Sequence, residues 1–326
     1  MVASADAEET LRGDSTFARS VTIRAYVNPP NTPQVHQWLH RYAVALALCT
    51  LFLVVAGASV TSKQAGLSVP DWPLSYGQVM PQMTGGVLFE HGHRMVATFV
   101  GLLTIGLAIW LARADQRAWM RKLGWIALGA VILQGLLGGL TVLLLLPPAV
   151  SVSHACLAQL FFSTTVAIAI FTSRSWQQGA ELVDDYGKPS LRSLAVLIPA
   201  LVLVQIALGA AFRHGAMTVL PHILGAMVVA GAILILCAFV LHQFPEHRSL
   251  RPAAVTLLVV TLVQVMLGIG AYFARLDAAK NPSAMVILTV AHVATGALTL
   301  ASSVALAIQI RRNVREQQHE GQAVAA

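Results

Sequence analysis

The chain has 326 residues, of which 56% are hydrophobic and only 11% are charged, and its mean hydropathy is +0.71. A soluble domain carries about a quarter charged residues, so this composition excludes an ordinary soluble fold and favours a lipid bilayer as surroundings. The net charge of +7 does not indicate nucleic acid as a partner, because the basic residues lie between apolar segments rather than in one patch. The three cysteines lie inside apolar runs without a CxxC motif, which excludes a secreted-type disulfide framework.

Residues 1–35 form a polar segment, with acidic residues early and an Asn/Pro-rich stretch at 28–33. The segment lacks the apolar core of a signal peptide, so a disordered, solvated tail is expected. The acidic start also disfavours a transit peptide. A bacterial cytoplasmic membrane is therefore the expected location.

Eight apolar segments follow, each about as long as the roughly 20 residues that a helix needs to cross a bilayer. They are expected at about residues 40–60, 89–112, 122–146, 150–172, 191–212, 218–241, 252–274 and 284–309. Most joints between them are short, so neighbouring helices should run antiparallel. The longest joint, at 61–88, contains Trp72 and Tyr76, which favour a position across the membrane interface.

The lysines and arginines predict the orientation of these helices. If the N-terminus lies inside, sixteen of these residues fall on the cytoplasmic side and five on the outer side. Basic residues accumulate on the cytoplasmic side of membrane proteins. Both termini are therefore expected in the cytoplasm.

A short motif recurs late in three of the odd-numbered helices. The segments 134–139, 205–210 and 264–269 each begin with Gln and have Gly four residues later, and 55–58 in the first helix is a weaker echo. Small residues let membrane helices approach closely, and four helices return the chain to the same side, as in parallel repeats. The fold class is predicted as all-α, a polytopic membrane protein with eight transmembrane helices in two pseudo-symmetric four-helix bundles. Chance similarity among Gly- and Leu-rich helices is the alternative.

Four histidines mark one depth in the predicted membrane domain. His93, His154, His222 and His292 lie near the starts of the second, fourth, sixth and eighth helices, all of which begin on the outer side. In an up-down bundle these helices form two diagonal pairs, about 11–14 Å apart. That spacing suits a haem whose iron takes one imidazole from each side. The sequence thus predicts two sites, one between the first two histidines and one between the last two.

Zinc and purely structural polar contacts are the alternatives for these histidines. Zinc prefers tetrahedral sets that include Cys or carboxylate ligands. The sequence has no HExxH motif, and its candidate ligands fall in pairs on separate helices. Haem is therefore favoured, held by coordination, because the CxxCH motif of covalent attachment is also missing.

The two histidine pairs differ in one carboxylate. Glu90 precedes His93 by one helical turn, so both side chains should share a helix face. A carboxylate beside a haem could stabilise positive charge or accept protons during an oxidation; the alternative is a charge favoured by the helix dipole. The pair His222 and His292 has no such neighbour and predicts a plain electron-carrying haem. His91 is expected to face away from His93.

A resemblance to a known family supports this interpretation. Residues 66–73 read Gly-Leu-Ser-Val-Pro-Asp-Trp-Pro and residues 90–94 read Glu-His-Gly-His-Arg, and together they resemble the haem A synthase family. The resemblance extends from about His36 to Ile310. It implies oxidation of the C8 methyl of haem O to a formyl group, which gives haem A for terminal cytochrome oxidases.

Carried over by position, the resemblance assigns roles in the first half of the chain. His93 and His154 would bind the iron of the substrate, haem O, and Glu90 would be the catalytic carboxylate. Arg94 would be a candidate contact for a haem propionate, although an arginine at a membrane interface would look the same.

In the second half, the resemblance implies that His222 and His292 bind one haem b cofactor. It also makes a haem O synthase and cytochrome oxidase assembly factors candidate partners. Some members of the family have a cysteine pair in the first outer loop, but this chain has no cysteine between Thr61 and Phe89. A thiol-based relay in that loop is therefore not expected.

The expected domain organisation follows from the helices and the histidines. A cytoplasmic tail at 1–35 precedes an N-terminal four-helix half at 36–173, which would contain the substrate haem site. A cytoplasmic linker at 174–190 leads to a C-terminal four-helix half at 191–310 with the haem b site, and a second cytoplasmic tail occupies 311–326.

Three other functions are alternatives. A di-haem cytochrome b that only transfers electrons would use the same four histidines, but it would need neither Glu90 nor the motif at 66–73; it is the main alternative. A transporter should show broken helices and ionisable residues at the midplane. The sequence shows neither of these transporter features. A haem O synthase should have aspartate-rich magnesium motifs, which the sequence also lacks.

Overall fold

The computed structural model describes residues 37–186 and 188–316, so most of the expected tails at 1–35 and 311–326 lies outside it. Eight helices of the described part are long and apolar enough to cross a membrane, as the sequence predicts. These helices are α1 (Gln37–Ser62), α2 (Gly85–Ala114), α3 (Ala118–Leu143), α4 (Pro148–Thr172), α6 (Leu191–Arg213), α7 (Leu220–Gln243), α8 (Leu250–Leu276) and α9 (Pro282–Asn313). A short helix, α5 (Arg174–Gln177), and two strands, β1 (Val183–Asp185) and β2 (Val314–Glu316), complete the description.

The helix α3 ends at Leu143, three residues before the expected 146. The apolar run continues to Leu146, but Leu145 and Leu146 adopt positive φ angles of 60° and 62°. Pro147 and Pro148 follow, and a residue before proline is disfavoured in the helical conformation. Pro148 then opens α4, since proline fits the first position of a helix.

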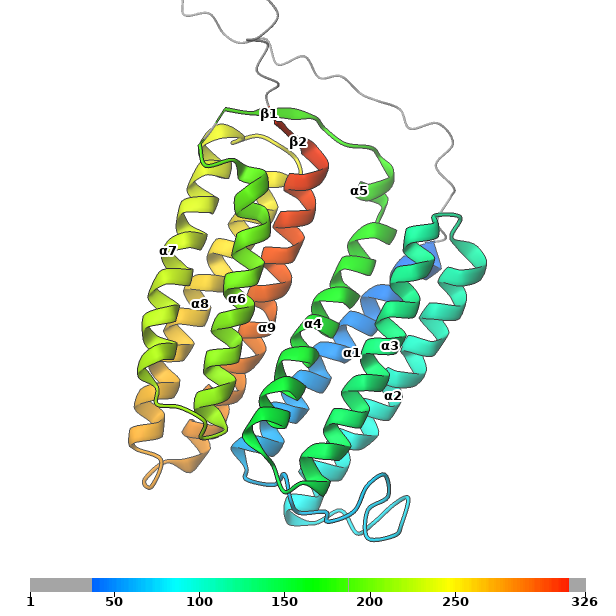
Figure 1. Ribbon diagram of the computed structural model, residues 1–326, viewed down its shortest axis with the longest axis vertical. Coiled ribbons are helices and arrows are strands. Elements are labelled where there is room, and N and C mark those ends of the chain that lie inside the picture. Colours follow the sequence, from blue (N-terminus) through cyan, green and yellow to red (C-terminus); the bar gives the residue numbers. More distant parts are fainter. Residues whose placement is uncertain (1–36, 187, 317–326) are drawn as a thin grey trace, which may run out of the picture.

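The helices form two groups of four (Figure 1). In each group every helix packs on its neighbours in the chain, and the ring closes through α1 against α4 or α6 against α9. The helices α2 and α4, and likewise α7 and α9, are therefore diagonal to each other. The groups meet through α9 against α1 and α4, and through α4 against α6.

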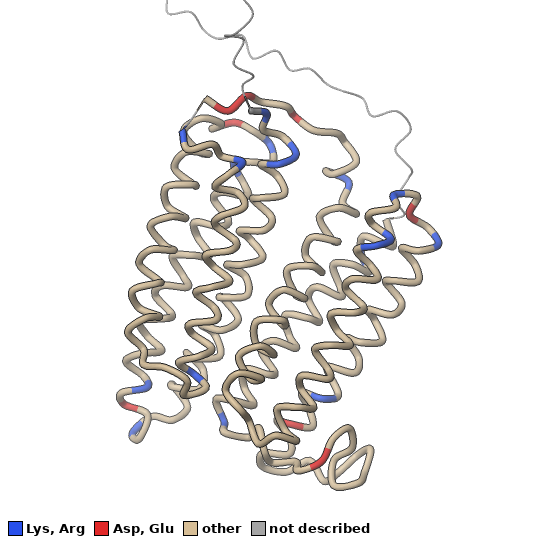
Figure 2. Tube along the Cα trace, viewed as in Figure 1, with Lys and Arg blue, Asp and Glu red and all other residues tan. Residues whose placement is uncertain are grey.

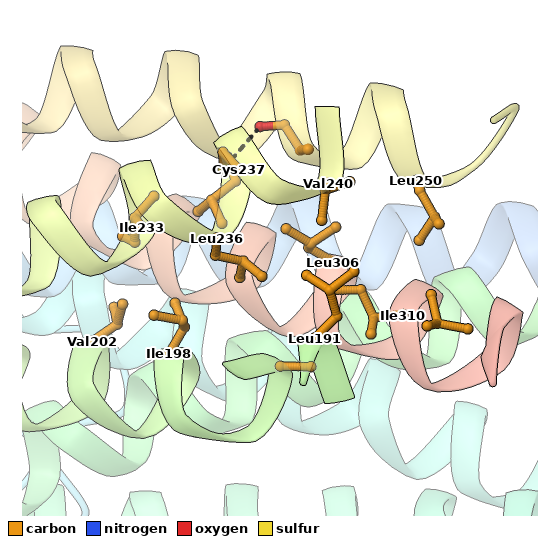
Figure 3. Packing of buried hydrophobic residues seen from close by; sticks show 14 of the residues in the cluster. Leu191, Ile198, Val202, Ile233, Leu236, Cys237, Val240, Leu250, Leu306 and Ile310 are labelled. Atoms are coloured by element: carbon orange, nitrogen blue, oxygen red, sulfur yellow. Dashed lines mark hydrogen bonds between the residues drawn. The ribbon is translucent and has the colours of Figure 1, made fainter. Parts of the chain in front are cut away.

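Buried apolar side chains fill the interior of each group. In the second group, residues of α6, α7, α8 and α9 interdigitate around Leu236 and Leu306 (Figure 3), and Cys237 Sγ donates a hydrogen bond of 3.4 Å to the Ala254 carbonyl. A small cluster joins the two groups and includes Phe162 and Ala297. Large apolar side chains also cover the outer surface, as expected where lipid is the solvent.

One end of the molecule is closed by polar contacts. β1 and β2 pair in parallel, with Val183 opposite Val314, and the Glu181 amide donates to Asn313 Oδ1 at 2.9 Å. The expected linker 174–190 thus contains α5 and β1, and the first residues of 311–326 continue α9 and form β2. Most lysines and arginines of the described chain lie at this end, whereas few lie at the opposite end (Figure 2).

Candidate functional site

The four predicted histidines lie on the two diagonal helix pairs. His93 is in α2 and His154 in α4, and His222 and His292 are in α7 and α9. Each imidazole rests on a glycine of the preceding helix, close enough that a Cβ there would contact the ring. The distances from such a Cβ to the ring Cε1 are 2.9 Å for Gly57 and His93, 3.1 Å for Gly138 and His154, 2.8 Å for Gly209 and His222, and 2.9 Å for Gly268 and His292.

The recurring motif therefore has a structural purpose that the sequence did not reveal. Its glycine makes room for the histidine ring of the next helix, and its glutamine, one turn earlier, contacts the same histidine. The glutamine Nε2 lies near a ring nitrogen in all three cases: 3.3 Å for Gln134 and His154, 2.9 Å for Gln205 and His222, and 3.5 Å for Gln264 and His292. The first two glutamines also donate to the backbone carbonyl of their histidine, at 3.0 and 2.7 Å.

In the second group, the rings of His222 and His292 lie with centroids 6.2 Å apart and planes at 87°. A bond between a metal and an imidazole nitrogen is about 2 Å long. Two imidazoles on opposite sides of one iron atom therefore have centroids roughly 6 Å apart. The observed spacing fits a haem iron between these two rings.

The zinc alternative finds no support in the geometry. Among the residues that the structure places, no three His, Cys, Asp or Glu side chains come together as a metal site. A zinc ion normally requires at least three such ligands. Pairs of histidines without a third ligand suit a haem better, because its four equatorial ligands come from the porphyrin.

Glu90 lies in the second turn of α2 and is 4% exposed. Its Oε1 accepts a hydrogen bond of 2.7 Å from Arg94 Nη2, and its Oε2 accepts one of 2.9 Å from the Val69 amide. Both carboxylate oxygens are therefore engaged, one by a cation and one by the backbone of the loop between α1 and α2. The arrangement holds an anion in a fixed position on the helix that carries His93.

Arg94 has partners other than the expected propionate. Besides Glu90, its Nη1 donates to the carbonyl oxygens of Asp71 at 2.7 Å and Leu74 at 2.8 Å. The guanidinium thus connects α2 to the loop that follows α1. The planar guanidinium, with its several donors, suits such a multiple contact, which lysine could not reproduce.

The loop at 63–84, which carries the motif at 66–73, packs against the start of α2 and the end of α3. Trp72 lies over Gly139, where a Cβ would come within 2.7 Å of its ring, and Ser68 lies directly against Gly86. Asp71 closes a turn by accepting hydrogen bonds from the amides of Tyr76 at 2.7 Å and Gly77 at 2.8 Å. The Gly77 amide is the largest cause that lowers the pKa of Asp71 below its ordinary value.

Two further residues at this end make contacts that the sequence pattern does not indicate. His91 is 6% exposed, and its Nδ1 is hydrogen-bonded to Ser75 Oγ at 2.7 Å. Arg213 ends α6, and its Nη2 donates to the Ala58 carbonyl at 2.6 Å and to Ser62 Oγ at 2.7 Å. Arg213 therefore joins the two helix groups. No sequence signal distinguishes it from an arginine that merely marks the membrane boundary.

Fold and site together define a class: a polytopic membrane protein with half-buried histidines paired on diagonal helices. The chain belongs to the COX15-CtaA family of cytochrome oxidase assembly proteins, whose family model matches residues 83–314. The resemblance to the haem A synthase family is thereby confirmed.

Several curated relatives named Heme A synthase are similar to this chain. The protein of Symbiobacterium thermophilum is 30% identical over 53% of this chain and 58% of its own length. That of Shouchella clausii is 30% identical over 55% of this chain and 60% of its own. The protein of Staphylococcus aureus is 24% identical over 71% of this chain and 84% of its own. The first two matches thus span little more than half of each relative.

Proposed function

We propose that this protein is an enzyme, a haem A synthase that oxidises the C8 methyl of haem O to a formyl group and so supplies haem A for terminal cytochrome oxidases. The proposal rests on one observation, which is that the surroundings of the two histidine pairs differ. Both pairs lie on diagonal helices, but only the first has a buried carboxylate, Glu90, and a folded outer loop beside it. A protein that only carried electrons would not need this additional structure.

In the second half, His222 and His292 would hold one haem b by its iron. When bound, that haem would supply one-electron transfer. The chain contributes the two imidazoles and a largely apolar surround from α6 to α9. Such a surround excludes water and tunes the reduction potential of a haem.

In the first half, His93 and His154 would bind the substrate haem O. With water as the oxygen donor, conversion of a methyl to a formyl group would release protons and electrons at a carbon atom near the haem edge, and the electrons would pass to a one-electron acceptor. Glu90 would stabilise the positive charge that develops there or accept one of the protons. Arg94 and the Val69 amide would keep the carboxylate in place, because a group that is already oriented stabilises a transition state without reorganisation.

The location of both sites follows from the distribution of charge. The end with β1 and β2 carries most basic residues (Figure 2), which favours a cytoplasmic position for that end and for both termini. The histidines and the loop 63–84 would then lie toward the outer side of a bacterial cytoplasmic membrane. In this arrangement 36–173 and 191–310 are the two pseudo-symmetric halves. Haem O synthase and oxidase assembly factors remain candidate partners, since haem O is poorly soluble.

Co-expression with a haem O synthase tests the proposal. Haems extracted from the purified protein and from the membranes are separated by chromatography for the wild type, Glu90→Ala and Glu90→Gln. Wild type should yield haem A or its alcohol precursor, whereas both variants should accumulate haem O. Asp277→Ala, which removes an exposed carboxylate at the same end of the molecule, is the matched control and should behave as wild type.

Two other results would redirect the proposal. If the wild type contained only haem B and left haem O untouched, the protein would be a di-haem electron carrier. If Glu90→Ala produced haem A at the wild-type rate, the carboxylate would serve only to hold the outer loop on α2.

A further inference from the structure

Arg213 is a half-buried cation at the end of α6 without a negative partner in the described chain. Its Nη2 donates to two neutral oxygens, the Ala58 carbonyl at 2.6 Å and Ser62 Oγ at 2.7 Å. Its Nε and Nη1 have no hydrogen-bond acceptor among the residues that the structure places. Arg94, by contrast, has Glu90 at 2.7 Å. A charge removed from water is costly unless an opposite charge compensates it.

A second cation increases this uncompensated charge. Arg275, at the end of α8, acts electrostatically on Arg213, and no carboxylate of the described chain does so. The Arg275 guanidinium lies over the ring of Phe212, the residue before Arg213, at 4.8 Å. Two positive charges thus lie near each other at the ends of α6 and α8. Like charges at close range repel each other, so an anion bound here would stabilise both.

The position of Arg213 on α6 relates it to the histidines of the second half. Gly209 stands one helical turn earlier on the same face of the helix, and a Cβ there would lie 2.8 Å from the His222 ring. Arg213 also acts electrostatically on His292, the other histidine of the pair. The guanidinium therefore lies near the histidine pair as well as against α1.

We propose that Arg213 binds a propionate carboxylate of the haem b that His222 and His292 would hold. The inference rests on the proposed function, because it takes these two histidines as the ligands of a haem. It deepens that function by naming the residue that recognises the acidic edge of the cofactor.

The arrangement of the helices explains why α6 would meet an edge of the haem. The two histidines come from α7 and α9, which are diagonal to each other, so α6 and α8 form the other diagonal of the second group. Axial ligands bind above and below the plane of a porphyrin. The edges of that plane therefore point toward α6 and α8, where the two cations lie.

The guanidinium has donors to spare for a carboxylate. It carries five N–H groups, and the described contacts use only those of Nη2. A carboxylate supplies acceptor oxygens and the missing negative charge, and hydrogen bonds between two charged groups are stronger than those between neutral ones. A propionate would accept from Nη1 or Nε and neutralise the cation, while Nη2 keeps its bonds to α1.

The other histidine seats have no comparable residue. One turn after the three remaining glycines that support a histidine ring, the chain has uncharged side chains, which are Thr61, Val142 and Tyr272. The arginine thus occurs only in the half where the haem would stay as a cofactor. An additional anchor suits a group that is retained better than a substrate that has to leave.

Haem B and its dimethyl ester, in which the propionates are uncharged, separate this contact from the rest of the site. Each is titrated into the full-length protein, prepared without haem in detergent, in a His154→Ala background that lacks one ligand of the first pair. The absorbance of the bis-histidine haem gives the affinity. Arg213→Met should reduce the preference for haem B over the ester about 10- to 100-fold, as expected for a hydrogen bond between charged groups.

The ratio of the two affinities is insensitive to a looser fold, because a loss of packing in Arg213→Met would weaken the binding of both porphyrins alike. Arg213→Lys keeps the charge without the planar donor group, so its preference should lie between those of arginine and methionine. Ser62→Ala removes a contact of Arg213 with α1 but keeps the guanidinium, and should retain the full preference. Arg275→Met removes an exposed cation that water screens, and should retain it too.

The two levels of the inference fail separately. If the protein with Arg213 intact bound neither porphyrin, the haem b site of the proposed function would be contradicted. If it bound both, and His222→Ala abolished this binding, the haem site would stand. An unchanged preference for haem B in Arg213→Met would then overturn the role of Arg213 alone.

Discussion

The connection between α1 and α2 spans residues 63–84, whereas its counterpart between α6 and α7 spans only 214–219. The long connection folds over the outer ends of its helices and is fixed by Glu90 and Arg94. The short one does no more than turn the chain. Yet both halves seat their histidines on glycines in the same way. The glycines that both halves share serve to hold the histidine rings. The connection that differs, with Glu90 and Arg94, therefore marks the half in which we propose that the reaction occurs.

The largest effect should come from removing a ligand of the second half. His222→Ala or His292→Ala should abolish binding of haem b, by more than about 100-fold, because loss of an outer-shell partner alone costs 10- to 100-fold. The haem B content of the purified protein, measured from its pyridine haemochrome spectrum, checks this. His242→Ala is the control, since His242 lies on α7 but at its other, exposed end.

Retention of a full complement of haem B by His222→Ala would contradict this prediction. The second half would then not be a haem site of the proposed kind, and the 6.2 Å spacing of its rings would be a packing feature only.

The next effect tests the glycines that both halves share. Gly209→Ala would bring a Cβ within 2.8 Å of the His222 ring, and overpacking of this kind typically destabilises by about 1–3 kcal/mol. Gly231 lies in α7 with nothing within 4 Å of its Cβ position. Gly231→Ala should therefore be neutral or stabilise by up to about 1 kcal/mol.

Thermal unfolding of the two variants in the same detergent, followed together with haem B content, compares them. Equal stability of Gly209→Ala and Gly231→Ala would show that the His222 ring can move away from the added Cβ at no cost. Gly209 would then have no role in holding the His222 ring.

Much of this fold could be predicted from the sequence because membrane helices are specified by their length and apolarity. All eight helices and the diagonal placement of the histidine pairs follow from runs of about 20 apolar residues and short joints. The end of α3 was placed too late because Leu144 to Leu146 are as apolar as the helix before them. Only the following prolines indicate that the helix must end earlier.

The site was harder to predict because its contacts come from the tertiary structure. A recurring Gln and Gly suggested helix packing, but the sequence does not show that both touch a histidine of the next helix. The sequence also does not show that the Arg94 guanidinium donates to two loop carbonyls as well as to Glu90. Such partners lie some 20 residues away in a loop without regular structure, where no periodicity indicates contacts.

A smaller effect concerns the joint between the halves. Arg213→Met removes two hydrogen bonds to α1, at Ala58 and Ser62. Interhelical hydrogen bonds in membrane proteins contribute about 0.6 kcal/mol on average and rarely more than about 1.7. A loss of about 1–2 kcal/mol in unfolding free energy is therefore expected, measured by denaturant titration in detergent.

Arg275→Met is the control for this prediction, because Arg275 is exposed and its guanidinium lies over the Phe212 ring, at 4.8 Å. If both variants were equally stable, the contact of Arg213 with α1 would not hold the halves together. The two groups would then be held together by the contacts of α9 with α1 and α4.

The smallest effect lies in the outer loop, the element that most clearly separates the two halves. Asp71 is partly exposed and its pKa is lowered, first by the Gly77 amide. A carboxyl whose pKa is lower in the folded state stabilises above its unfolded value and loses this contribution as the pH falls through the folded value. The turn should thus be unchanged from pH 7 to 5 and loosen only below the ordinary value of 3.8.

Hydrogen exchange of the Tyr76 and Gly77 amides, corrected for the intrinsic pH dependence, measures this. Asp71→Asn should speed exchange severalfold at pH 7, since one acceptor becomes a donor, and abolish the acid transition; loosening of the wild-type turn already at pH 6 would assign the transition to another group.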